Sequence, residues 1–156
     1  MDTIPYASQL KNLKQIYYAL LSGILLISAT ITIVTNGSTE TLSIPMLRII
    51  KYAAPLFSVV CILLSSLLYK KIIDNTTAVQ SGLQEKLNGY KSACICRWAI
   101  LEAGIIFNIV LYCITNYNYC LVIAFFILVF FILYAPSKAQ AQNHLRLSEA
   151  EQRSLE

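Results

Sequence analysis

Four long blocks of apolar residues, separated by polar segments, constrain this chain more than any other feature. The blocks lie at about residues 16–34, 52–69, 98–114 and 119–135. A helix that crosses the hydrocarbon core of a bilayer needs about 20 mostly apolar residues. Charged residues make up only 13% of the chain, against roughly a quarter in a typical soluble domain. The sequence therefore predicts an all-α integral membrane protein, a four-helix bundle of antiparallel hairpins, over residues 1–136.

The positions of the basic residues predict on which side of the membrane the chain ends lie. Ten of the twelve basic residues lie before the first block, between the second and third blocks, or in the polar segment after the fourth. Only Arg48 and Lys51 fall on the opposite side of a four-span arrangement. Cytoplasmic loops of membrane proteins carry an excess of Lys and Arg, so we expect both termini in the cytoplasm.

Polar segments next to the blocks are predicted to extend two of the helices. The first helix is expected to begin near Ala7. Apolar residues recur at helical spacing before the third block, so residues 80–97 are expected to form an amphipathic cytoplasmic extension that runs into that block. Pro55 in the second block is expected to bend the helix, and the segment 75–77, after that block, can break and restart it. Residues 137–156 are expected to form a polar cytoplasmic tail, in which Ser148 would open a short helix.

Glu102 is the only acidic residue inside any of the blocks. A carboxylate in hydrocarbon is costly, so such residues face the bundle interior and usually have a partner. One interpretation makes Glu102 a proton or cation site. The other makes it a structural group that bonds to a hydroxyl of another helix or is neutralised by Arg97. The predicted polar cluster contains Glu102 and the other polar residues expected near it or further along the third block, which are Arg97, Ser22, Ser65, Ser66 and Asn108.

Motifs of soluble enzymes and nucleic-acid-binding proteins are missing from the sequence. It contains no Gly-rich phosphate loop, no His-Glu-x-x-His and no Gly-x-Ser-x-Gly. The five cysteines are interpreted as small apolar residues of the helices, and no metal site or cofactor is expected. The net charge of +4 comes from residues at the block ends, so the expected partner is the lipid bilayer, not nucleic acid. A second copy of the chain or another membrane protein is the candidate protein partner.

Small residues predict where helices approach each other closely. Ala19 and Gly23 are spaced four residues apart in the first block, as are Ala99 and Ala103 in the third, with Gly104 beside them. This spacing permits close packing of membrane helices. We expect these residues to form packing faces within the bundle.

Several segments resemble a family of small bacterial four-span inner-membrane proteins. They are LKNLKQIYY at 10–18, the segment 85–93, RWAILE at 97–102, and the segments 136–138 and 145–148. The resemblance implies a location in the bacterial inner membrane and assigns no activity.

A second, local resemblance involves GYKSA at 89–93, AILEAG at 99–104 and Phe107. These residues resemble the ion-binding helix of ATP synthase c-subunits, in which a membrane carboxylate carries protons or sodium ions. The resemblance implies that Glu102 would be the ion carrier. The Gly-rich first helix and the Arg-Gln-Pro turn of that family have no counterpart in this chain.

Two functions follow from these observations. The first is a non-enzymatic structural or accessory component of a membrane. The second is a proton- or cation-coupled transporter, or a proteolipid-like subunit, that uses Glu102.

Overall fold

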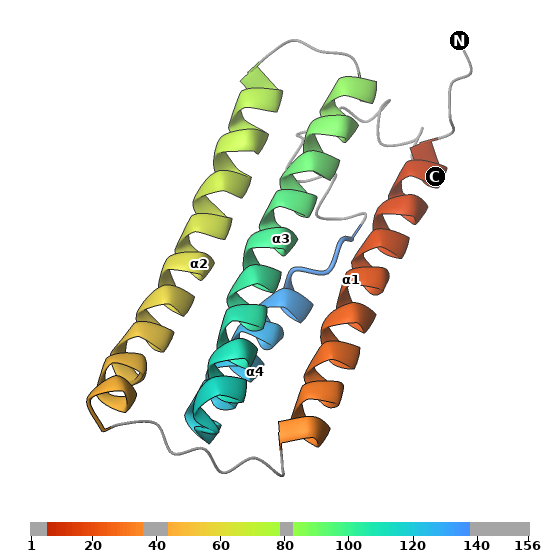
Figure 1. The fold of residues 1–156 in the computed structure, drawn as a ribbon. Helices are drawn as coiled ribbons and strands as arrows, with labels where there is room; N and C mark the ends of the chain where they lie inside the picture. The colour runs from red at the N-terminus through yellow and green to blue at the C-terminus, as the bar shows by residue number, and fades with distance from the viewer. Residues whose placement is uncertain (1–5, 36–43, 79–82, 138–156) are drawn as a thin grey trace.

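The computed structural model describes residues 6–35, 44–78 and 83–137. Within these ranges the chain forms four α-helices and no strand. They are α1 (Tyr6–Thr35), α2 (Ile44–Ala78), α3 (Leu83–Thr115) and α4 (Asn118–Leu133). Successive helices run antiparallel, so α1 and α3 share one direction and α2 and α4 the other (Figure 1). The all-α helical bundle predicted from the sequence is confirmed.

Helix α3 lies at the centre of the bundle and packs against each of the other three helices. Helices α1 and α2 lie on opposite sides of α3, and α4 lies behind it (Figure 1). The buried residues of α3 recur at intervals of three and four, which places them on one face of a helix. They include Tyr90, Cys94, Trp98, Leu101, Ile105, Asn108 and Ile109.

Three of the described helices are long and apolar enough to cross a membrane. The qualifying segments are Lys11–Ile33 in α1, Arg48–Ala78 in α2 and Gln84–Thr115 in α3. Helix α4 is a shorter apolar helix of 16 residues, which corresponds to about 24 Å at the rise of an α-helix. By length and composition, the chain therefore has the helices of a membrane protein.

Large apolar side chains cover the outward faces of these helices. In α4, Val122, Phe125, Phe126, Ile132 and Leu133 are each more than half exposed. A soluble protein rarely exposes apolar patches of this extent. The outward faces of α4 and α2 are thus suited to contact with lipid.

Helix α2 is longer than the sequence predicted. It continues through the lysine pair at 70–71 and the segment 75–77 to end at Ala78. The hydroxyls of Thr76 and Thr77 donate to the carbonyls of Ile72 and Ile73, at 2.8 and 3.0 Å. The two threonine hydroxyls therefore bond to carbonyls of their own helix and do not favour a non-helical backbone. Continued packing on α3 also favours the helical state, and the predicted interruption is wrong.

Other expected boundaries agree with the structure or lie outside it. Helix α1 begins at Tyr6, close to the expected start, and α3 begins at Leu83, within the predicted extension. Pro55 lies inside α2, which is one continuous helix on both sides of it. The predicted short helix at Ser148 lies outside the described residues.

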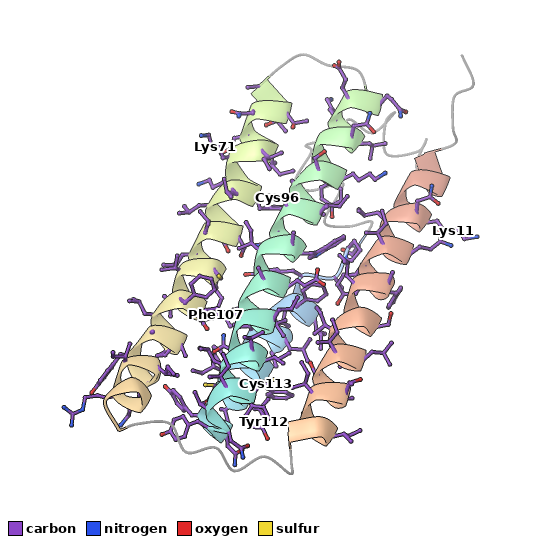
Figure 2. All side chains as sticks on the ribbon, viewed as in Figure 1. Lys11, Lys71, Cys96, Phe107, Tyr112 and Cys113 are labelled. Carbon is purple, nitrogen blue, oxygen red and sulfur yellow. The ribbon has the colours of Figure 1, made fainter. Side chains whose placement is uncertain are left out.

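The three longer helices continue past the end of α4. Figure 1 shows α4 ending partway along α3, while α2 and α3 extend further in the same direction. Lys11 of α1 and Lys71 of α2 project outward at this end of the bundle (Figure 2). We call this end of the bundle, which contains the first turns of α1 and α3 and the last turns of α2, the basic end.

Candidate functional site

Glu102 and Arg97, the two charged members of the predicted polar cluster, are not paired with each other. Both lie on α3, but five residues separate them, so their side chains leave the helix about 140° apart. Trp98, one turn before Glu102, contacts Tyr17 of α1, with 5.2 Å between the ring centroids. Glu102 therefore leaves α3 on the side of α1. It is partly exposed, and no hydrogen bond or ion pair joins it to any other residue in the described ranges.

The serines of the predicted cluster do not reach Glu102 either. Ser22 is exposed and donates to the carbonyl of Ala19 in its own helix, at 2.9 Å. Ser65 is fully buried and donates to the carbonyl of Ile62, again in its own helix, at 2.8 Å. Ser66 is partly exposed. The structure therefore does not gather these side chains into one polar pocket around Glu102.

Asn108 forms a separate polar centre between α3 and α2. Its Nδ2 donates to Ser58 Oγ at 2.9 Å and to the carbonyl of Gly104 at 2.8 Å. The Ser58 hydroxyl in turn donates to the carbonyl of Ala54 at 2.7 Å. Since a carbonyl can only accept, the contact with Gly104 fixes which end of the amide is the nitrogen. We call Asn108, Ser58 and Gly104 the amide centre.

The amide centre lies deep in the apolar part of the bundle. Asn108 is completely buried, and it lies ten residues, or about 15 Å, along α3 from Trp98. Its Oδ1 is buried and has no hydrogen-bond partner among the described residues. Gly104 lies at the contact with α2, where a Cβ atom would be 3.4 Å from the Cβ of Cys61. The centre joins α2 to α3 through small residues and one interhelical hydrogen bond.

A cluster of aromatic rings lies nearer the basic end and joins three helices. The ring of Tyr17 in α1 stacks on Phe131 of α4 at 5.3 Å and contacts Trp98 of α3. Trp98 Nε1 donates to the carbonyl of Tyr134 at 3.1 Å, and the Tyr17 hydroxyl donates to the carbonyl of Phe131 at 3.4 Å. We call Tyr17, Trp98, Phe131 and Tyr134 the aromatic cluster. It connects the end of α4 to α1 and α3.

Arg97 lies beside the aromatic cluster and contacts tyrosine rings on two other helices. Its Cζ is 4.4 Å from the ring centroid of Tyr69 in α2 and 3.4 Å from that of Tyr134, just past α4. Cations are attracted to the faces of aromatic rings. The carbonyl end of α4 also carries a partial negative charge, which favours a cation nearby. These contacts stabilise Arg97, and the pairing with Glu102 that was one of the alternatives is not formed.

The sequence did not single out Tyr69, Tyr134 or Ser58 as partners of polar groups. The sequence did contain a signal for the tyrosines. Each lies at the end of an apolar block, and Arg97 lies at the start of the third block, on the same side of a four-span arrangement. Residues at the same level of a bundle can come into contact. No comparable signal marked Ser58, since its pairing with Asn108 depends on the rotation of α2 about its axis.

Metal ligands do not gather in the part of the chain that the structure describes. No group of three or more His, Cys, Asp or Glu residues there could hold a metal ion. The cysteines are free thiols, and three of them, Cys61, Cys94 and Cys120, are buried. Comparison of the chain with protein-family models, with curated proteins and with solved structures finds no match.

Proposed function

We propose that this chain is a structural or accessory component of a bacterial inner membrane, without enzymatic activity of its own. The observation that supports this proposal most directly is where the intramembrane polar groups bond. Ser22 and Ser65 donate to carbonyls of their own helices, and Asn108 donates to Ser58 and Gly104 within the bundle. The hydrogen bonds of these groups are therefore made within the helices or between α2 and α3, and the groups do not converge on a common point.

The proposal includes four spans with both termini in the cytoplasm. Helix α4 follows α3 after a turn in which Asn116 has φ 51°, a left-handed conformation that asparagine tolerates. The Asn116 N–H donates to the carbonyl of Tyr112 at 2.7 Å. Such a tight turn sends α4 back alongside α3. Basic residues concentrated at the opposite end support a cytoplasmic location for that end.

Reporter fusions test this topology. Fusions after Ser43 and after Asn118 are expected to report a location outside the cytoplasm, while a fusion to the C-terminus is expected to report the cytoplasm. A cytoplasmic signal from either of the first two would contradict the four-span arrangement.

Glu102 gives one specific reason to keep a second candidate, an ion-coupled transporter or proteolipid-like subunit. The carboxyl is partly exposed within the apolar length of α3 and has no partner in the described ranges. A carboxyl with these properties could bind a proton or cation. Ion carriage requires that a hydrophobic carbodiimide labels Glu102 in its protonated form, so that labelling falls as the pH rises, and that a bound cation protects the carboxyl.

Ion flux into proteoliposomes separates the two candidates. Under the structural proposal, the wild type and Glu102→Gln show the same flux as empty liposomes. Glu85→Gln removes an exposed carboxylate in the first turn of α3 and serves as the matched control. A flux that Glu102→Gln abolishes and Glu85→Gln retains, in protein that is still helical, would reject the structural proposal and support the transporter.

A further inference from the structure

Arg97 is a cation whose neighbours include two aromatic rings. Its guanidinium contacts the rings of Tyr69 and Tyr134 at 4.4 and 3.4 Å. No acidic side chain of the described ranges lies within ion-pair distance of it. Its Nε is buried and makes no hydrogen bond within the same ranges. The tyrosine rings therefore contact the faces of the guanidinium, and these contacts do not use the hydrogen-bond donors of Arg97.

The depth of Arg97 in the bundle matches a membrane interface. It directly precedes Trp98, and α4 ends at Leu133, next to the Tyr134 that contacts it. Beyond this level the three longer helices continue without α4 (Figure 1). Tryptophan and tyrosine concentrate at the headgroup level of bilayers. Arg97 is only partly exposed, so it lies where apolar helix surface gives way to polar surface.

The charge around this level is strongly positive. The described part of the basic end contains seven basic and two acidic side chains. The basic residues are Lys11, Lys14, Lys70, Lys71, Lys86, Lys91 and Arg97, and the acidic residues are Asp74 and Glu85. At the other end the described residues include only Arg48 and Lys51 as charged side chains. An anion that approaches the bundle is therefore attracted to the basic end.

We propose that Arg97, held between Tyr69 and Tyr134, binds the phosphate of an anionic phospholipid headgroup in the cytoplasmic leaflet. The planar guanidinium can donate two parallel hydrogen bonds to a phosphate, and ring contacts fix its orientation beforehand. Lys70 and Lys71, which follow Tyr69 in α2, add positive charge at the same interface. This inference rests on the proposed membrane orientation, because only the cytoplasmic leaflet faces the basic end in that arrangement.

A lipid phosphate is favoured over a soluble phosphate by the surroundings of the site. At this level of the bundle the outward faces of α2 and α4 carry exposed Leu67 and Leu133, and Leu133 adjoins Tyr134. An acyl chain can lie along such an apolar surface while the headgroup reaches Arg97. A free phosphate ion would gain only the polar contacts and would lose its hydration.

Trp98 provides a direct readout, because it is the only tryptophan of the chain and adjoins Arg97. The full-length protein is reconstituted in phosphatidylcholine containing increasing fractions of phosphatidylglycerol with brominated acyl chains, which quench tryptophan. We expect the wild type to prefer phosphatidylglycerol over phosphatidylcholine. In Arg97→Gln we expect this preference to be about fivefold lower, which is the effect of one basic side chain at an anionic surface. Arg48→Gln removes one charge at the other end and is expected to retain it.

A second variant keeps the test informative if Arg97→Gln does not fold. Arg97→Lys retains the charge but loses the planar pair of donors, so we expect a loss of about two- to threefold. An unchanged preference in Arg97→Lys and in folded Arg97→Gln would overturn the proposal, as would an equal loss in Arg48→Gln. Displacement by millimolar inorganic phosphate would instead identify a soluble anion as the ligand and also overturn it. The reporter fusions test the topology separately, so a failed lipid preference with both outer fusions still outside rejects only the lipid site.

Discussion

Helices α2 and α1 both pack on α3, but they do so by different means. The buried face of α2 toward the bundle includes small and polar residues, among them Ala54, Ser58 and Ser65. In the part of α1 whose side chains are described, the buried residues are Leu13, Tyr17 and Ile24. In hydrocarbon, close packing of small residues and interhelical hydrogen bonds drive association. The α2–α3 contact has both, whereas the α1–α3 contact depends on large side chains and on the ring of Tyr17.

Small residues illustrate the difference most clearly. On the α2 side, a Cβ atom on Gly89 would overlap Thr76, and Gly104 lies against Cys61. These glycines let the backbones of α2 and α3 approach each other. On the α1 side, Ala19 is exposed and nothing lies within 4 Å of a Cβ atom added to Gly23. The spacing of small residues in a sequence thus shows where close approach is permitted, but not where it occurs.

The aromatic cluster is the main attachment of α1, and its loss is expected to have the largest effect. Trp98 is completely buried and contacts both Tyr17 and the carbonyl of Tyr134. Trp98→Ala should lower the free energy of unfolding by about 3–5 kcal/mol. Unfolding in mixed micelles with increasing SDS, followed by circular dichroism, measures this change.

Trp98→Phe is the matched control for that experiment. It keeps most of the ring volume and removes only the hydrogen bond from Nε1 to Tyr134, so a loss of about 1 kcal/mol is expected. Equal losses for the two substitutions would mean that the hydrogen bond to Tyr134, and not the packing of the ring, accounts for the stabilisation by Trp98.

A pair of glycine substitutions tests the comparison of the two sides directly. Gly89→Ala places a methyl group against Thr76 of α2 and should destabilise the protein by about 1–3 kcal/mol, because the helices must separate or Thr76 must move. Gly23→Ala meets no neighbour and should be neutral or stabilising by up to about 1 kcal/mol, the gain in helix propensity. SDS unfolding of both variants measures the difference. A Gly23→Ala variant as unstable as Gly89→Ala would show that α1 packs closely on a surface outside the described contacts.

The sequence was a good guide to the helices and a poor guide to the contacts between side chains. Long apolar blocks determine helices because unpaired backbone groups are too costly in hydrocarbon, so the four helices could be predicted. The end of α2 could not be, because the packing of Thr76 against Gly89 of α3 is a tertiary contact. Loop propensity alone favoured an interruption there.

The predicted polar cluster failed for a related reason. It was assembled from the depth of each residue along its helix, and depth says nothing about the direction in which a side chain leaves the helix axis. Ser22 and Ser65 bond within their own helices, and Arg97 contacts tyrosines on the opposite side of α3 from Glu102. The rotation of each helix is fixed by packing of the whole bundle. The packing prediction for Ala99 and Ala103 was wrong for the same reason, since both are exposed, while Gly104 beside them is buried against α2 and α4.

The smallest expected effect concerns the interhelical hydrogen bond of the amide centre. Ser58→Ala removes the acceptor on α2, but Asn108 Nδ2 keeps its bond to the carbonyl of Gly104. A double-mutant cycle with Asn108→Leu should give a coupling energy of about 0.6 kcal/mol, typical of such bonds in membrane proteins. Ser65→Ala is the matched control, because the Ser65 hydroxyl donates to its own helix and should show no coupling to Asn108→Leu. If Ser65 and Ser58 couple equally to Asn108, the hydrogen bond adds nothing specific, and small residues alone distinguish the α2 side of α3 from the α1 side.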